Sequence, residues 1–316
     1  MEANSGLTTQ EVAEILNISK NTVYELIKRG ELNAYKVGKK VRIDLNDVME
    51  YKNRTKTSQT PSSAYESSSI PIVYKSNNDY PKQNSFVICG QDILLDSLSR
   101  YLQFNSKGFQ AVRSYEGSYN GLYSLYHGIV QMTTVHLWDG ETGEYNVSYV
   151  RRMLPGIPTV MIHLASRLQG FYVLKGNPKG IKDWEDLRRK DITMINREKG
   201  SGTRILLDEQ LKRLGIQASG IEGYHRESTS HLAIASTVAR GGADVGLGNE
   251  KSALQVSGID FIPLQTEQLD LVMIKEDLAK PEFKAVLSIL NSKEFKLELE
   301  GLGGYNIDQI GKLQEI

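Results

Sequence analysis

The sequence predicts a protein of two unequal parts, a small helix-turn-helix module with a hairpin wing followed by a larger α/β domain. Three observations predict this division. Two short capped helices, a tight turn and a hairpin pattern occupy the segment before residue 55. A stretch rich in Ser, Thr, Asn, Pro and Lys comes next. After residue 84, short apolar runs alternate with stretches of helical periodicity.

The composition fits a protein with a sizeable buried core and no membrane segment. The chain has 316 residues, 40% of them hydrophobic, and no apolar run approaches the length of a bilayer span. The N-terminus lacks the basic and apolar regions of a secretory signal. A single cysteine, Cys89, excludes an internal disulfide and suits a reducing compartment, so we expect a cytoplasmic protein. The formal net charge is zero, so affinity for nucleic acid has to come from a local patch.

The N-terminal module begins with two short amphipathic helices. Thr8 or Thr9 caps the first, with Glu11 placed for a capping box, and Ser19 opens the second. A hairpin pattern around Gly38-Lys39 follows, in which apolar and basic side chains alternate, and a closing helix is predicted over residues 44–51. The apolar stripes of the two helices are formed by Val12, Ile15, Leu16, Val23, Leu26 and Ile27.

Positive charge gathers on the second helix and the hairpin. Between Lys20 and Arg42 there are seven basic residues and two acidic ones, a local excess of five in a neutral chain. The second helix of a helix-turn-helix enters the major groove, where basic side chains meet phosphates and polar ones reach base edges. The alternative is that these lysines only solvate a small domain. The residues predicted to contact double-stranded DNA are Lys20, Asn21, Thr22, Tyr24, Lys28, Arg29, Lys39, Lys40 and Arg42.

This module resembles the excisionase-type winged helix-turn-helix, which is related to the MerR type. The resemblance lies in the runs Leu-Thr-Thr-Gln-Glu-Val-Ala-Glu-Ile-Leu and Ser-Lys-Asn-Thr-Val-Tyr-Glu-Leu-Ile-Lys-Arg-Gly-Glu-Leu, and it covers roughly residues 7–52. It implies DNA binding, although the same module also serves recombination directionality factors. We place the DNA-binding domain at residues 1–54 and a flexible linker at 55–84.

The remaining chain alternates strand and helix. Strand-like runs are predicted at 86–89, 111–114, 130–137, 192–195, 244–247, 261–264 and 271–274, and an apolar stretch runs over 159–173. Helices are predicted at 119–126, 144–154, 184–189, 231–239, 282–290 and 294–299, and after Asp92 and Gly202. Repeated βα units predict a parallel sheet covered by helices, with ligands at the carboxyl ends of the strands.

The loop from Asn196 to Arg204 joins one such strand to the next helix. Its glycines let the backbone come close to a ligand, and the start of a helix offers unpaired N–H groups and partial positive charge to an anion. An ordinary capped turn is the alternative. Three other loops follow predicted strands with similar residues, at Cys89 to Asp92, at Ser114 to Ser118 and at His136. The residues predicted to bind a small anion are Gly90, Gln91, Gly117, Ser118, His136, Arg197, Ser201, Gly202, Thr203 and Arg204.

Residues 85–316 resemble the type II periplasmic-binding-protein-like domains that are found fused to helix-turn-helix modules in bacterial and archaeal regulators. The matching runs are Gly-Ser-Tyr-Asn-Gly-Leu, Val-His-Leu-Trp-Asp-Gly-Glu-Thr-Gly-Glu-Tyr-Asn, Asn-Arg-Glu-Lys-Gly-Ser-Gly-Thr-Arg-Ile-Leu-Leu-Asp and Gly-Gly-Ala-Asp-Val-Gly-Leu-Gly. The resemblance implies a lobe of about 85–170 with 270–316 and a second lobe of about 171–269, which close on a ligand. A weaker similarity points to molybdate and tungstate binders, although Cys89-Gly90-Gln91 stands where these carry a Thr/Ser-rich loop.

Other classes of function find less support in the sequence. There is no Gly-x-Ser-x-Gly elbow, Walker loop or spaced carboxylate pair, so we expect no enzyme and no cofactor. His136, Asp139 and Glu141 match no compact metal motif, so we expect no bound metal. The sequence therefore predicts a one-component transcription regulator, acting as a homodimer, that senses an oxyanion such as molybdate or tungstate. Two alternatives stay open, a regulator that senses an organic acid or pterin-like molecule and an excisionase-like architectural protein.

Overall fold

The computed structural model describes residues 6–38, 40–45, 47–48, 51, 85–105 and 110–316. These residues fall into two compact units, one before and one after the segment 52–84. Each unit is described by itself. The predicted fold class, an N-terminal helix-turn-helix and a C-terminal two-lobe α/β domain, is confirmed.

The first unit is built from two helices and a hairpin. Helix α1 (Thr9–Leu16) carries the predicted capping box between Thr8 and Glu11, and Asn17 ends it in the left-handed conformation. Helix α2 (Lys20–Lys28) is capped by Ser19, and strands β1 (Tyr35–Val37) and β2 (Lys40–Arg42) pair antiparallel. The stretch 44–51 is helical at its described positions 45, 47, 48 and 51. The core of the unit consists of Val12, Ala13, Val23, Leu26, Leu32, Ile43 and Val48.

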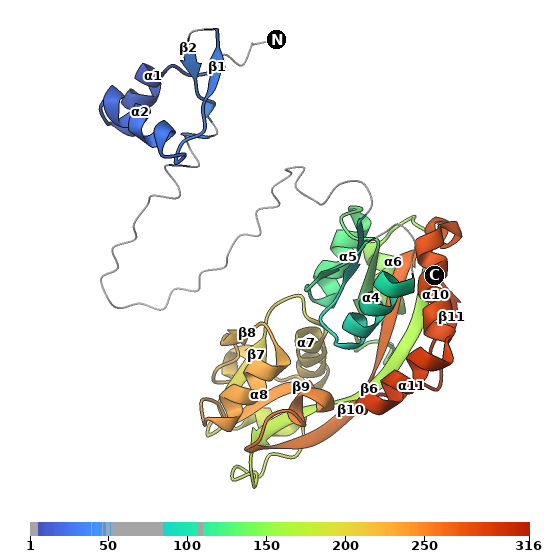
Figure 1. Cartoon of the computed structure of the whole chain (residues 1–316). Coiled ribbons are helices and arrows are strands. Elements are labelled where there is room, and N and C mark those ends of the chain that lie inside the picture. Colours follow the sequence, from blue (N-terminus) through green and yellow to red (C-terminus); the bar gives the residue numbers. More distant parts are fainter. Residues whose placement is uncertain (1–5, 39, 46, 49–50, 52–84, 106–109) are drawn as a thin grey trace. The chain divides into compact units, whose positions relative to one another are not determined.

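The first lobe of the second unit is a mixed sheet with helices on it (Figure 1). Strands β3 (Ser85–Cys89), β4 (Gln110–Ser114) and β5 (Met132–Val135) are parallel, as predicted for βα units. Helices α4 (Leu94–Asn105), α5 (Ser118–Tyr126) and α6 (Val147–Met153) connect them to one another and to the next strand. Helices α10 (Pro281–Asn291) and α11 (Lys293–Leu302) and strand β11 (Leu313–Glu315) return to this lobe at the end of the chain.

The second lobe repeats this plan with shorter elements. Strand β7 (Met194–Arg197) runs parallel to β8 (Glu227–Ser228) and β9 (Val245–Asn249). Helices α7 (Gly202–Leu214), α8 (His231–Ala239) and α9 (Glu250–Ala253) each follow one of these strands. Short 3₁₀ turns lie at Trp184–Arg188 and Ala218–Gly220 in this lobe and at Lys275–Ala279, where the chain re-enters the first lobe.

Two long antiparallel strands join the lobes, β6 (Thr159–Leu174) and β10 (Ile259–Ile274) (Figure 1). The sequence suggested two separate strands, 261–264 and 271–274, where the structure has one. The polar run between them broke the apolar pattern, yet its backbone stays paired with β6, and register shifts occur at Pro263/Gln265 and Leu269/Asp270. Because side chains alternate along a strand, Thr266 and Gln268 line a cavity on one face of the pair, whereas Glu267 between them contacts Arg167.

Candidate ligand cleft and DNA-binding module

A cavity of about 480 Å³ lies between the two lobes, against the crossover strands. Its wall is drawn from both lobes and holds most of the strand-end loops that the sequence singled out. The polar part of the wall is formed by Gln91, Asp92, Asp96, Tyr115, Glu116, Ser118, Thr134, His136, Arg167, Arg197, Ser201, Thr229, Ser230, His231, Asn249, Lys251, Ser252, Gln255 and Tyr305. We call this cavity the cleft.

Three helices point their N-termini at the cleft. Helix α5 begins after Gly117, whose cap has no side-chain hydrogen bond, and α7 begins after Ser201, whose hydroxyl accepts from the backbone N–H of Arg204 at 3.2 Å. Helix α8 begins after Ser230, which caps it in the same way. The first turns of all three contribute to the cleft wall. Since the first N–H groups of a helix lack intrahelical partners and carry partial positive charge, this arrangement suits an anion.

The two arginines of the cleft are already paired with carboxylates. Arg167 is buried and contacts both Asp92 and Glu267. Burial acts to lower the pKa of Arg167, but these two carboxylates outweigh it and raise the pKa. Arg197, also buried, donates to Glu198 at 2.7 Å and 2.8 Å. The cleft therefore has no excess of positive charge, and an anion in it would depend on neutral donors and helix N-termini.

Two histidines of the cleft are held in the neutral form. Burial lowers the pKa of His136, whose Nδ1 lies 3.1 Å from the hydroxyl of Ser118. Burial, followed by the nearby Arg197, holds the pKa of His231 well below its ordinary value. The Nδ1 atom of His231 is buried without a hydrogen-bond partner among the described residues. Both imidazoles can thus act as hydrogen-bond donors or acceptors toward a ligand.

The lobes touch one another across the cleft. The backbone N–H of Tyr119 donates to the carbonyl of Gly200 at 3.1 Å. Arg197 donates to the amide oxygen of Gln91 at 2.5 Å, and at the far edge Lys212 pairs with Glu141 at 3.0 Å. These bonds join the first lobe to the second, so the structure is in a closed arrangement.

Most of the predicted DNA-binding residues are exposed on the first unit. Lys20, Tyr24 and Lys28 recur at helical spacing on α2, away from its buried Val23 and Leu26. Asn21, Thr22, Arg29 and Lys40 are exposed as well. Four predicted residues have partners within the unit. The Thr22 hydroxyl lies 2.8 Å from that of Ser19, and Arg42 donates to the carbonyl of Gly6 at 3.2 Å. The Tyr24 hydroxyl accepts from Thr9 at 3.4 Å, and Arg29 lies 4.0 Å from Glu31. Lys39 lies outside the described residues.

Comparison with known proteins assigns both units. Residues 7–56 match the helix-turn-helix domain family, and residues 99–291, more than half of the chain, match the PBP superfamily domain. The chain belongs to the PBP superfamily. The uncharacterised protein YvgK of Bacillus subtilis is 44% identical over 322 residues, which covers 99% of each chain, so both units recur together in this relative.

Solved structures share the fold of the PBP domain at low sequence identity. One is described as a phosphate ABC transporter substrate-binding protein from Clostridium perfringens with bound phosphate, with a TM-score of 0.53 and 16% identity over 70% of this chain and 98% of its own. Another is a cysteine-to-serine mutant of OxyR from Corynebacterium glutamicum with bound H₂O₂, with a TM-score of 0.50 and 12% identity over 93% of this chain and 89% of its own. At these identities the likeness concerns the fold alone.

The PBP domain brings most of the predicted ligand residues to one cleft. Gln91, Gly117, Ser118, His136, Arg197, Ser201 and Gly202 line it. Gly90, Thr203 and Arg204 do not. Gly90 is buried against Thr134, and its N–H and carbonyl are bonded to Ser114 and Arg113. Thr203 is buried with its hydroxyl unbonded among the described residues.

Arg204 points away from the cleft into the second lobe. Its guanidinium pairs with Asp208 at 3.1 Å and Glu227 at 2.9 Å, and it stacks on the ring of Tyr224 at 4.4 Å. The prediction that Arg204 binds the ligand therefore does not agree with the structure. Asp208, four residues further along the same helix, was a signal in the sequence for this structural role.

Several cleft residues were not predicted. Arg167 reaches the cleft from the interior of β6, and Asn249 reaches it from the end of β9. The start of α8 contributes Thr229, Ser230 and His231. The signal for Arg167 was its charge inside the apolar run of β6, because burying a charge is unfavourable unless the charge is paired. Among the described residues there is no group of His, Cys, Asp and Glu that could hold a metal ion, and no helix that could cross a membrane.

Proposed function

We propose that the protein is a one-component transcription regulator whose PBP domain closes on a small anion and thereby changes how its helix-turn-helix domain binds DNA. The observation that supports the anion most directly is the convergence of three helix N-termini on the cleft. With its arginines paired, the cleft offers neutral donors, which are the first N–H groups of these helices and hydroxyls such as that of Thr134. Charge-assisted hydrogen bonds from such donors are strong where water is excluded. The Ser201 hydroxyl caps α7 and already donates to the carbonyl of Glu198 at 2.9 Å.

The first ligand that we propose is a tetrahedral oxyanion such as molybdate or tungstate. Its oxygens only accept hydrogen bonds when it is fully deprotonated, and the N–H and hydroxyl groups of the cleft can donate to them. The phosphate-bound protein of Clostridium perfringens supports the idea that this fold can enclose such an ion. Regulators of this kind act as dimers on paired half-sites, so we also propose a homodimer.

An organic anion is the second candidate, because the cleft is large and partly apolar. Even in the closed arrangement it has a volume of about 480 Å³, more than a bare tetrahedral ion fills. Ile93, Tyr115 and Leu232 are exposed large hydrophobic residues on its wall, from both lobes. They could pack against the body of an organic acid or a pterin-like molecule whose charged group sits at the helix N-termini.

Isothermal titration of the full chain with molybdate, tungstate, sulfate, phosphate and a set of organic acids distinguishes the candidates. Saturable binding of molybdate or tungstate, weakened by Ser118→Ala and by Ser201→Ala, supports the oxyanion. Ser228→Ala serves as the matched control, since Ser228 does not line the cleft. If an organic acid binds and no inorganic ion does, the proposal of a regulator stands and the proposal of an oxyanion ligand is wrong. If no anion of either kind binds, the proposed sensing function is wrong.

A further inference from the structure

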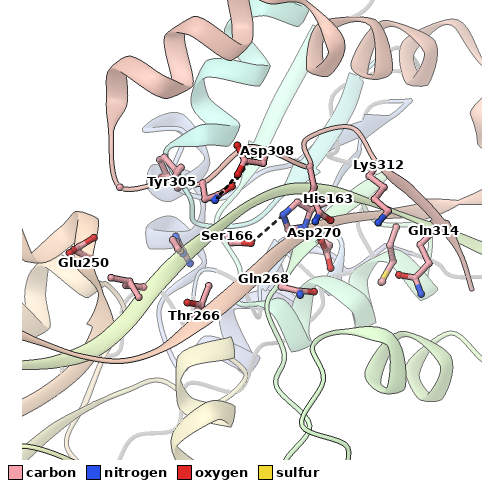
Figure 2. A pocket seen from close by; sticks show the side chains of 16 residues that line it. His163, Ser166, Glu250, Thr266, Gln268, Asp270, Tyr305, Asp308, Lys312 and Gln314 are labelled. Carbon is pink, nitrogen blue, oxygen red and sulfur yellow. Dashed lines mark hydrogen bonds and ion pairs between the residues drawn. The ribbon is translucent and has the colours of Figure 1, made fainter.

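A second cavity, of about 710 Å³, lies on the other face of the crossover strands (Figure 2). Ser166 of β6 and Thr266 and Gln268 of β10 line it, whereas Leu269 of β10 lines the cleft. The rest of the wall comes from other residues of the two crossover strands, from the first lobe within residues 304–314, and from Glu250 of the second lobe. We call this cavity the hinge pocket, since it spans the strands that join the lobes.

The hinge pocket and the cleft share part of their walls. Arg167 and Tyr305 line both. The hydroxyl of Tyr305 donates to Asp92 at 2.8 Å, and Asp92 and Glu267 both contact Arg167. A molecule that touches Tyr305 in the hinge pocket is therefore one hydrogen bond away from a carboxylate of the cleft.

The free polar groups of the hinge pocket are mainly uncharged. Among the described residues, the side chains of Thr266, Gln268, Gln309 and Gln314 line the pocket and form no hydrogen bond or ion pair that would occupy them. Amide and hydroxyl side chains both donate and accept hydrogen bonds, as sugar and polyol hydroxyls do. The charged lining residues nearly cancel, with Arg167 and Lys312 against Glu250, Asp270 and Asp308. A strongly charged ligand is thus disfavoured.

Ser166, His163 and Asp270 in the same pocket follow one another in the order of a catalytic triad. The cluster lacks a free backbone N–H group at the serine to stabilise an oxyanion. The Ser166 hydroxyl lies 3.4 Å from Nε2 of His163, and Nδ1 of His163 lies 2.8 Å from Asp270 (Figure 2). However, the backbone N–H of Ser166 donates to the carbonyl of Asn306 at 2.8 Å, so it cannot stabilise an oxyanion on an attacked substrate. Asp270 is also held by Asn146 at 2.7 Å. The cluster therefore offers hydrogen-bonding groups in fixed positions to a ligand, and it is not equipped to catalyse hydrolysis.

We propose that the hinge pocket is a second binding site, for an uncharged small molecule rich in hydroxyl or amide groups. The open Gln and Thr side chains bind its polar groups, and the ring of Tyr305 packs against its carbon face. Because the site spans both crossover strands and shares Tyr305 and Arg167 with the cleft, its occupancy changes the affinity of the cleft. The coupling rests on the proposed anion sensing, whereas binding in the hinge pocket does not.

The binding step is tested without any anion. The full chain is titrated calorimetrically with D-ribose, D-glucose and N-acetyl-D-glucosamine as probes. We expect saturable binding of at least one, weakened about ten-fold by Gln268→Leu and by Gln309→Leu, since each removes hydrogen bonds of the site. Gln217→Leu, a change of the same kind at an exposed residue that lines neither cavity, should leave binding unchanged. No saturable binding of any probe, or equal binding by all variants, overturns the site.

The coupling step uses Tyr305→Phe, which keeps the ring and removes the bond to Asp92. We expect the bound sugar to shift the anion affinity of the unmodified chain by about five-fold or more, and to shift it less in Tyr305→Phe. The same anion affinity with and without sugar, in a chain that binds both, overturns the coupling. A chain that binds the sugar and no anion overturns the proposed function and leaves the hinge pocket standing.

Discussion

The neutral imidazoles of His136 and His231 make the stability of the PBP domain depend on pH. In the unfolded chain both rings take up protons near their ordinary pKa, whereas burial lowers the pKa of each in the folded domain. The unfolded state therefore binds more protons as the pH falls. The free energy of unfolding should decrease below about pH 6.5, by at most about 1.4 kcal/mol per pH unit for each histidine.

Thermal or denaturant unfolding between pH 5 and pH 8 measures this effect. His231→Asn should flatten the pH dependence, because it removes one of the two rings. His127→Asn is the matched control, since His127 is exposed on the same domain. Equal pH profiles for His231→Asn and the unmodified chain would show that His231 is not held neutral.

Single residues also show how far the sequence predicts the site. Gly117, Ser118, Ser201 and Gly202 could be predicted, because each stands where a strand ends and a helix begins. Arg204 has the same place in the sequence, yet Glu227 and Tyr224 hold it in the second lobe. Those partners come from a segment about twenty residues away, and local sequence gives no account of such contacts.

Among the elements, the close approach of α5 and α7 determines whether the lobes can close. A Cβ at Gly202 would lie 2.3 Å from Cδ2 of His136, and one at Gly117 would lie 2.6 Å from the carbonyl oxygen of Gly200. Both contacts cross from one lobe to the other. Gly202→Ala should therefore hold the lobes apart and weaken anion binding by about ten-fold or more, since the closed state becomes less populated.

Calorimetry of anion binding and small-angle scattering of the full chain test this expectation. Gly301→Ala is the control, because a Cβ at Gly301 in α11 would meet nothing within 4 Å. That variant should bind the anion as the unmodified chain does, and the alanine should favour its helix slightly. If Gly202→Ala binds the anion with full affinity, the lobe contact at His136 is not required for binding.

At the level of elements, periodicity predicts most strands and helices and fails where a segment passes between lobes. Helix α8 has the predicted bounds, and β3, β4 and α5 differ from prediction by one residue at one end. The continuity of β10 was not predictable, because its polar residues line the hinge pocket or bond to distant polar side chains, surroundings that only the folded molecule creates. The short strands β8 and β11 were also missed, since their pairing partners lie far away in the sequence.

For the whole molecule, charge distribution predicts how DNA binding responds to salt. The chain is neutral overall, yet the segment from Lys20 to Arg42 has an excess of five positive charges. Each lysine that meets a phosphate should contribute roughly 0.9 to the slope of log affinity against log salt. Lys20→Ala combined with Lys40→Ala should weaken binding to a selected DNA sequence and reduce that slope by about two.

Fluorescence anisotropy at several salt concentrations measures the slope. Lys284→Ala combined with Lys293→Ala, an equal loss of charge at exposed positions on α10 and α11, should leave it unchanged. A slope that stays the same in the double variant would place the DNA-binding surface elsewhere on the first unit.

The two units can act as one regulator only if the anion and DNA affect each other's binding. Linkage requires that the factor by which the anion changes DNA affinity equals the factor by which DNA changes anion affinity, typically about five-fold or more. Both affinities can be measured on the full chain with the same DNA, and the two factors should agree. In Gly202→Ala both factors should approach one, because the lobes of that variant close little when the anion binds. Tight binding of each ligand with no mutual effect would instead mean that closure of the PBP domain does not reach the DNA-binding unit.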